Sequence, residues 1–246
     1  MSQPYQRIFL LSHMRAYSSL IGHILGSHPR INGYYEIHIS YNTAESLAQQ
    51  EQRYAQHDRF KPGSRFLFDK LLHNGYEPDL TLPGLENASL LLALRKPEET
   101  IKSILKLFRE KNTDAPYSYP AEATRYYVER MEKLTEFTRQ HPQRYYYFDT
   151  ELVCIDTAGL LQTLADWLEL DTPLSEQYQR FAKTGVAGAG DTSAAISSGA
   201  IIKNAVEDFS DATLEDSLLQ QAKHTYQECR EHLIRNAIAT CTYSNN

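Results

Sequence analysis

The chain of 246 residues has few cysteines, no long apolar run and no G-x-x-x-x-G-K-[ST] phosphate loop. Its three cysteines, Cys154, Cys229 and Cys241, show neither a paired pattern nor the spacing of metal ligands, which indicates a reducing compartment without a disulfide framework. No apolar stretch approaches the roughly 18 residues that cross a membrane. The N-terminal apolar run, IFLL, is too short for a secretory signal, so we expect a cytoplasmic protein without a membrane partner.

The chain also lacks a positive charge excess. Its formal net charge is −6, which argues against nucleic acid as a partner and requires a local basic pocket for any anionic ligand. The histidines show no ligand spacing along the sequence, so we expect no metal. A hydrophobic content of 41% is that of an ordinary globular protein with a sizeable core.

Apolar runs of strand length alternate with segments of helical period along most of the chain. The predicted strands are Arg7–Leu11, Phe66–Phe68, Ser89–Leu94 and Tyr145–Phe148. The predicted helices cover about residues 16–27, 43–56 (capped by Thr43), 97–110, 121–140, 156–168 (capped by Asp156) and 214–239. Residues 33–40 are expected to be an extended or loop segment, and residues 111–120 and 183–200 are expected to be loops. This order predicts an α/β three-layer sandwich with a central, mostly parallel sheet.

Two segments, residues 8–25 and 89–105, each combine a buried strand, a tight turn and a helix with basic and hydroxyl side chains. Arg15, Ser18 and Ser19 lie at the first turn, and Arg95 and Ser103 accompany the second. The N-terminus of a helix with such residues favours an anion. Two anion sites on one parallel sheet predict a nucleotide that carries both a 5′ and a 3′ anionic group.

These segments resemble the sulfotransferase family that uses 3′-phosphoadenosine 5′-phosphosulfate (PAPS). The MRAYSSL sequence at residues 14–20 is similar to the family's P-R-S-G-[ST]-[ST]-L phosphosulfate loop, and Arg95 and Ser103 have the spacing of its 3′-phosphate motif. Phe68-Asp69-Lys70 resembles the family's D-K strand end, and YFDTEL at residues 147–152 resembles its V-x-Y-E-D-L segment. GDTSAAISSGAI, residues 190–201, is similar to a loop that folds over the cofactor.

The resemblance implies a P-loop-like sulfotransferase fold that occupies residues 1–246 as one domain, and it implies roles for individual residues. Lys70 would face the sulfuryl group, and Arg15 would neutralise charge on the leaving group. The residues implied to bind PAPS are Arg15, Ala16, Tyr17, Ser18, Ser19, Arg95, Ser103, Thr192 and Ser193. Tyr17 stands where the family has glycine, so it would either keep an ordinary conformation or point its ring into the acceptor site.

The resemblance also implies a general base for the proton of the acceptor. Glu36 lies where the glutamate-type members carry their base, shortly after Ser27-His28-Pro29, which resembles the family's S-H-P turn. His38 is the rival because small-molecule members use a histidine. In an extended segment the two side chains point the same way, so both can face an acceptor.

Together the residues and the resemblance predict a sulfotransferase that moves a sulfuryl group from PAPS to a hydroxyl, or to an amine, of a small molecule such as a natural product or a sugar. A protein-tyrosine sulfotransferase is one alternative. An ATP-dependent small-molecule kinase is another, disfavoured by the missing phosphate loop. A non-catalytic nucleotide binder is the third. The sequence does not indicate an oligomeric state.

Overall fold

A single parallel sheet organises the chain. The structure is a computed structural model that describes residues 5–111, 114–203, 209 and 212–243. The strands are β1 (Gln6–Leu11), β2 (Ile31–Asn32), β3 (Phe66–Leu71), β4 (Ser89–Leu94), β5 (Tyr146–Asp149) and β6 (Ala239–Cys241). They form a six-stranded sheet in the order β2-β3-β1-β4-β5-β6, and every pairing is parallel.

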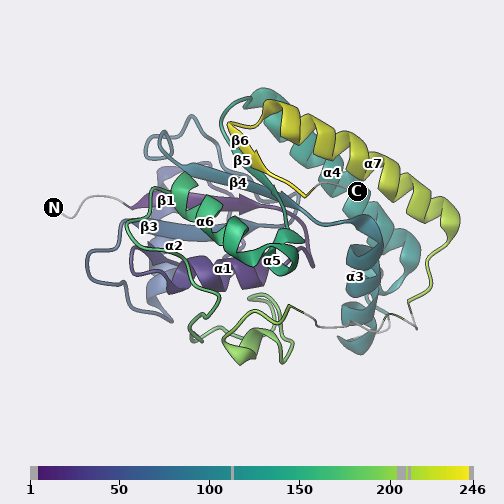
Figure 1. Cartoon of the computed structure of the whole chain (residues 1–246), viewed down its shortest axis with the longest axis horizontal. Helices are drawn as coiled ribbons and strands as arrows, with labels where there is room; N and C mark the ends of the chain where they lie inside the picture. Colours follow the sequence, from purple (N-terminus) through teal and green to yellow (C-terminus); the bar gives the residue numbers. More distant parts are fainter. Residues whose placement is uncertain (1–4, 112–113, 204–208, 210–211, 244–246) are drawn as a thin grey trace.

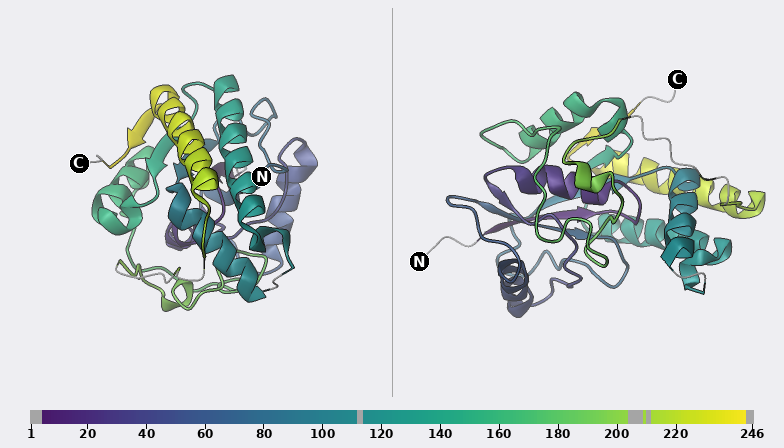
Figure 2. Two further views of the ribbon diagram at one scale, coloured as in Figure 1. Left: turned by 90° about the vertical axis from the view of Figure 1, so that its right-hand side faces the viewer. Right: turned by 90° about the horizontal axis from the view of Figure 1, so that it is seen from below.

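Helices cover both faces of this sheet (Figure 1). They are α1 (Ser18–Ser27), α2 (Ala44–Ala55), α3 (Pro97–Lys111), α4 (Pro120–Gln140), α5 (Leu152–Ile155), α6 (Thr157–Trp167) and α7 (Asp216–Asn236), with short 3₁₀ helices η1 (Pro116–Ser118) and η2 (Ile196–Ser198). Helices α1, α5 and α6 pack on one face, and α2, α3, α4 and α7 on the other, as Figure 2 shows from two further sides. The predicted three-layer α/β sandwich is therefore confirmed.

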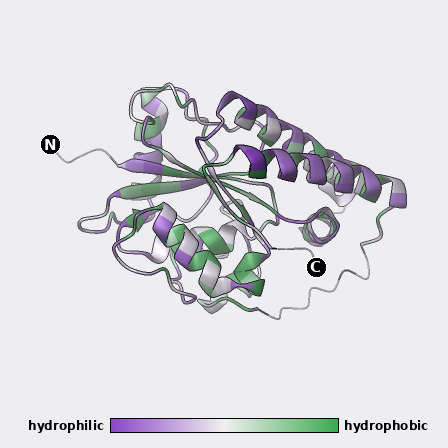
Figure 3. Ribbon diagram, turned by 45° about the horizontal axis from the view of Figure 1, so that its top comes forward, coloured by the Kyte–Doolittle hydropathy of each residue, from purple (hydrophilic) through white to green (hydrophobic). Residues whose placement is uncertain are grey.

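The alternation of side chains along β1 divides the core in two. Phe9 and Leu11 point into the cluster under α2, α3, α4 and α7, whereas Ile8 and Leu10 point into the cluster under α1, α5 and α6. All four are at most 1% exposed, which explains why a strand buried on both faces reads as a continuous apolar run. Figure 3 shows the complementary pattern in the long helices α4 and α7, whose outward sides are largely hydrophilic.

Helix starts follow the sequence closely, whereas short strands do not. Thr43 caps α2 through a reciprocal bond with Ser46, and Asp156 accepts a hydrogen bond from the Gly159 amide at the start of α6, as predicted. Strands β2 and β6 were not predicted, because segments of two or three residues are too short to show the alternation of apolar and polar side chains that marks a strand. The predicted last helix was wrong at its end, because residues 239–241 pair with β5 instead.

A buried arginine holds the carboxyl ends of two strands together. Arg130 of α4 is 1% exposed, and its guanidinium donates to the carbonyl oxygens of Ser12 (2.8 Å) and Leu71 (2.6 Å), which follow or end β1 and β3. These carbonyls lie where the parallel ladder stops. The Leu71 carbonyl also accepts from the Ser12 amide at 3.3 Å, and the guanidinium supplies further donors to both carbonyls. Arg130 thereby fixes the position of the two loops that leave this edge of the sheet.

We expect Arg130→Met to lower the free energy of unfolding by about 3 kcal/mol, because methionine fills the space but removes the buried, charge-assisted hydrogen bonds to the Ser12 and Leu71 carbonyls. Urea denaturation would measure the change. Arg125→Met, at an exposed position of the same helix, is the control and should change stability by less than about 1 kcal/mol. Equal effects of the two substitutions would contradict the role given to Arg130.

Among the described residues, no helix combines the length and the apolar character needed to cross a membrane.

Candidate active site

The chemically distinctive side chains gather at the carboxyl edge of the sheet, where β1, β3 and β4 end. This edge contains the point at which the strand order reverses, since the chain runs from β1 outward to β2 and later returns to the other side of β1 as β4. A cavity of about 470 Å³ lies there. Its lining residues are Arg15, Tyr17, Ser18, Ser19, Leu20, Arg95, Lys106, Cys154, Tyr178, Asp191, Ser193, Ala195, Ile196, Ala200, Ile202 and Lys203.

The N-terminus of α1 opens into this cavity. No side chain caps the helix in the described part of the chain, and its first turn contains no acidic residue. The first intrahelical bond runs from the Ile21 amide to the Tyr17 carbonyl, so the amides of Ser18, Ser19 and Leu20 precede the helical ladder. Donors of this kind, together with the positive end of the helix dipole, favour an anion at this position.

A buried lysine stands beside this helix end. Lys70 ends β3, is 1% exposed, and donates from Nζ to Oγ of Ser19 at 2.9 Å. Burial lowers the pKa of Lys70, while the carboxylates of Glu36 and Asp69 oppose this shift. A cation removed from water is stabilised by an anion placed against it. Lys70, Ser19 and the α1 amides therefore form a first anion cluster.

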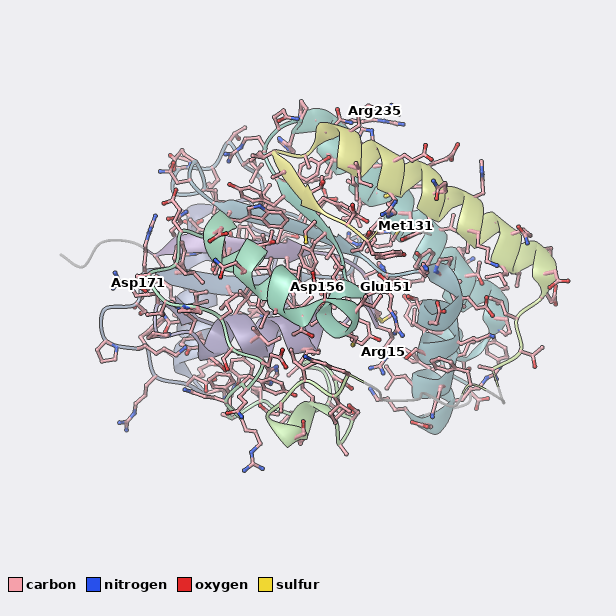
Figure 4. The ribbon with its side chains drawn as sticks, viewed as in Figure 1. Arg15, Met131, Glu151, Asp156, Asp171 and Arg235 are labelled. Atoms are coloured by element: carbon pink, nitrogen blue, oxygen red, sulfur yellow. The ribbon has the colours of Figure 1, made fainter. Side chains whose placement is uncertain are left out.

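Arg15, Arg95 and Ser103 form a second anion cluster. Arg15 donates from Nε to Oγ of Ser103 on α3 at 2.8 Å, and Arg95 donates from Nη1 to the Arg15 carbonyl at 3.0 Å. Figure 4 shows Arg15 in the space between the sheet edge and α3, above the segment that contains η2. Two guanidinium groups at one cavity wall provide the planar donors suited to a phosphate.

The loop of residues 183–200 closes over both clusters and brings a carboxylate with it. The Asp191 amide donates to Oγ of Ser19 (2.9 Å), and its Oδ1 lies 3.2 Å from Nη1 of Arg15. Burial alone would raise the pKa of Asp191, but Arg15 and Ser193 outweigh it and hold this pKa below its ordinary value. At Gly190 a Cβ would lie 2.7 Å from the Ser19 hydroxyl oxygen, so this close approach requires glycine.

Glu36 lies in the segment after β2, close enough to Lys70 for their charges to interact. It is 8% exposed, and its Oε1 has no hydrogen-bond partner among the described residues. Nε2 of His38 lies 3.5 Å from that oxygen and Nε2 of His73 lies 3.7 Å from it. A buried carboxylate oxygen without a donor is available to a further hydrogen-bond donor or ligand.

Asp69 holds the Glu36 segment against the sheet. Its Oδ1 accepts a hydrogen bond from the Ile37 amide at 3.0 Å, and its Oδ2 accepts one from the Tyr41 hydroxyl at 2.6 Å. Burial raises the pKa of Asp69 to about 7 despite these bonds. Asp69 and Lys70 are consecutive residues of one strand, so they point to opposite faces: Asp69 anchors the Glu36 segment, and Lys70 contacts Ser19 at the start of α1.

A smaller cavity of about 250 Å³ adjoins Glu36. Its lining residues are Tyr35, Glu36, Ile37, Arg53, Gln56, His57, Lys183, Val186, Ala187, Gly188 and Ala189. The Glu36 amide donates to the Ala189 carbonyl at 3.3 Å, which joins this wall to the loop that covers the larger cavity. Glu36 thus lines a different cavity from the one that Arg15 and Arg95 line.

Comparison with known proteins gives a match in structure but none in sequence. No protein-family model and no curated protein matches the chain. The sulfotransferase domain from the curacin biosynthetic pathway superposes with a TM-score of 0.62 and 17% identity, over 93% of this chain and 99% of that one. The sulfotransferase domain of the Synechococcus PCC 7002 olefin synthase gives 0.55 and 15%, over 93% and 95%.

The chain has the sulfotransferase fold. The resemblance inferred from short motifs therefore agrees with the three-dimensional arrangement over most of the chain. At these identities the agreement concerns the fold, so the roles of individual residues rest on the geometry described above.

Within this sulfotransferase fold, Tyr17 does not have the ordinary backbone conformation that was one of the two expectations from the sequence. Its φ is 53°, in the left-handed region that glycine adopts readily, so the expectation of an ordinary conformation was wrong. Its ring lines the larger cavity, and the Arg95 guanidinium stacks 4.5 Å from the ring centroid. The aromatic face thus supports an arginine of the second anion cluster, and it does not line the hollow beside Glu36.

Of the other residues implied by the resemblance to bind the cofactor, some line the larger cavity and some do not. Ala16 is fully buried, and Ser18 is 4% exposed at the cavity. Ser193 lines the cavity, and its hydroxyl donates to Asp191 at 2.9 Å. Thr192, by contrast, is exposed and does not line the cavity.

Several residues of this edge of the sulfotransferase fold were missed by sequence reasoning. His13 accepts a hydrogen bond from the Arg95 amide at Nε2 (3.0 Å), and burial lowers its pKa to about 3. It therefore joins the ends of β1 and β4 as a neutral imidazole. Asp191 lies directly before the expected loop residues Thr192 and Ser193, but sequence reasoning did not single it out. His73 follows Lys70 closely, but nothing in the sequence links it to Glu36.

Proposed function

We propose that the protein is a PAPS-dependent sulfotransferase that acts on a hydroxyl, or an amine, of a small molecule. The observation that carries this proposal is the pair of anion clusters at the edge of the sheet, together with the buried carboxylate of Glu36 near Lys70. An adenosine nucleotide with anionic groups at the 5′ and 3′ positions matches two clusters, whereas adenosine monophosphate matches one. The sulfotransferase fold supports the same assignment.

The residues of the cavity suit such a donor. The N-terminus of α1, Ser19 and Lys70 would hold the 5′-phosphosulfate, since their donors are unopposed by any acid of the first helical turn. Arg95 and Ser103 would hold the 3′-phosphate, with Arg15 between the two groups. PAPS supplies an activated sulfuryl group. Lys70 and Arg15 would neutralise the negative charge that develops on the departing phosphate.

Glu36 would accept the proton of the acceptor. Its Oε1 is buried without a hydrogen-bond donor and adjoins the smaller cavity, which is of a size for a small molecule or one side chain of a larger one. The acceptor oxygen loses its proton to Glu36 as the new S–O bond forms. His38 remains the rival base, because its Nε2 lies 3.5 Å from the same carboxylate.

The acceptor class follows from the neighbours in structure and from the cavity. The two matched domains come from a biosynthetic pathway for curacin and from an olefin synthase, so we propose a biosynthetic small molecule as the acceptor. Arg53, His57 and Lys183 at the smaller cavity would favour an acceptor with an anionic group.

Asp191 should weaken the binding of the nucleotide. Its carboxylate pairs with Arg15 in the cavity, so the ligand must displace it or tolerate its charge. We expect Asp191→Asn, which keeps the size of the side chain, to tighten the binding of adenosine 3′,5′-bisphosphate by about tenfold. Isothermal titration calorimetry measures this change. Weaker binding by the variant would show instead that the carboxylate orders the loop for the ligand.

The experiment for the function is a panel of hydroxyl- and amine-bearing acceptors incubated with PAPS. Release of adenosine 3′,5′-bisphosphate that depends on one acceptor, with the mass of one SO₃ group added to that acceptor, would support the proposal. Binding of the bisphosphate without release on any acceptor would favour the non-catalytic binder. Phosphate transfer from ATP with magnesium would favour the kinase and overturn the proposal.

A further inference from the structure

Three side chains from two separate loops meet around one buried oxygen. Glu36 and His38 follow β2, and His73 follows β3; their ligand-type atoms all lie within 4.8 Å of one another. Glu36 is 8% exposed, and its Oε1 has no hydrogen-bond donor among the described residues. This oxygen is therefore open to a ligand that is not one of the described residues.

The distances are longer than those of a hydrogen bond and are compatible with a shared ion. A charge-assisted hydrogen bond between nitrogen and a carboxylate oxygen measures about 2.7–2.9 Å. The separations here are 3.5 Å from His38 and 3.7 Å from His73. Two ligands that each lie about 2.0–2.1 Å from a tetrahedral zinc ion are about 3.4 Å apart. The observed separations are thus nearer to those of two ligands on one ion.

We propose that Glu36, His38 and His73 form a binding site for a divalent transition-metal ion of the zinc type. Two imidazole nitrogens and one carboxylate oxygen make a common set of protein ligands for zinc, with the remaining positions open to water or another ligand.

The positions of the two histidines favour a ligand role. His38 and His73 each place Nε2 near the same carboxylate oxygen, at 3.5 Å and 3.7 Å, so both nitrogens can reach one ion. The nearby positive charge of Lys70 opposes a dication. Three protein ligands beside a cation predict an exchangeable ion of moderate affinity and not a structural zinc.

Metal binding would also regulate the site, and this consequence rests on the proposed function. The ion would occupy Oε1 of Glu36, the atom proposed to accept the proton, so it would inhibit transfer. Binding itself does not depend on that role. A result in which zinc binds but leaves transfer unchanged would keep the metal site and refute Glu36 as the base.

The experiment titrates the metal-free full chain with Co²⁺, which reports its coordination by visible absorption, and with Zn²⁺ by calorimetry. We expect one site with tetrahedral-type cobalt absorption, displaced by zinc. His73→Ala should weaken Zn²⁺ binding by about 10–100-fold or more. His224→Ala is the matched control, because His224 and Glu228 make an exposed pair at 3.5 Å elsewhere.

Circular dichroism of the metal-free variants establishes that each one is folded before it is titrated. Loss of the cobalt band in His73→Ala but not in His224→Ala supports the site. His73→Gln, which keeps a polar side chain of similar length, should lose the band as well. Absence of a tetrahedral band in the unmodified protein, or equal affinity of His73→Ala and the unmodified protein, would overturn the proposal.

Discussion

Glu36→Gln will slow sulfuryl transfer by about 10²–10⁴-fold, because glutamine keeps the shape of the side chain but cannot accept the acceptor's proton. The affinity for adenosine 3′,5′-bisphosphate should stay unchanged, since Glu36 does not line the larger cavity, which contains Arg15 and Arg95. Single-turnover measurements with PAPS and an acceptor from the panel give the rate, and calorimetry gives the affinity. A chelator in the assay removes any metal bound at Glu36.

His38→Ala distinguishes the two candidate bases. If Glu36 is the base, this variant should retain most of its rate, because the carboxylate still faces the acceptor. The opposite result would assign the role of base to His38. In that case His38→Ala would slow transfer by about 10²–10⁴-fold, and Glu36→Gln would slow it only mildly. Glu45→Gln, at an exposed position early in α2, is a carboxylate control without an expected effect.

Arg95→Met will weaken the binding of adenosine 3′,5′-bisphosphate by about 100-fold, which corresponds to the loss of one or two charge-assisted hydrogen bonds. Adenosine 5′-phosphate should bind the variant nearly as well as it binds the unmodified protein, because it lacks the 3′ group. Methionine keeps an apolar stem against Tyr17, which the arginine covers at 4.5 Å. Calorimetry with both nucleotides measures the two affinities.

Lys102→Met is the matched control for Arg95→Met. It removes the same charge from the neighbouring helix, but Lys102 pairs with Glu98 (2.8 Å) and does not line the cavity. It should change either affinity by less than about threefold. Arg95→Met could instead weaken the binding of both nucleotides equally. That result would mean that Arg95 positions the turn at Arg15, through its hydrogen bond to the Arg15 carbonyl, and does not contact the 3′-phosphate.

The main architecture was predictable from local patterns. The runs at β1 and β4 are apolar because both faces of these strands are buried, and this makes a central parallel strand recognisable. Strand β3 was predicted too short, because the apolar run stops at Phe68 and the charged pair Asp69-Lys70 marks its end in the sequence. Both are at most 1% exposed, and they remain in the ladder because Tyr41, Ile37 and Ser19 satisfy their side chains.

The site was predictable in its residue types and less so in its connections. The motifs pointed to Arg15 and Ser103 as members of different anion sites, yet the two side chains are hydrogen-bonded at 2.8 Å. The contact of His73 with Glu36 and that of Asp191 with Arg15 join loops that are far apart in sequence. Such contacts depend on strand order and loop closure, which no local pattern encodes.

The most direct test of the account is the affinity of the unmodified protein for adenosine 3′,5′-bisphosphate, compared with adenosine 5′-phosphate and with ATP plus magnesium. The account predicts that the bisphosphate binds about 100-fold more tightly than the monophosphate, because only it engages both anion clusters. Equal affinities for the bisphosphate and the monophosphate, or a preference for ATP with magnesium, would contradict the PAPS site and with it the proposed sulfotransferase.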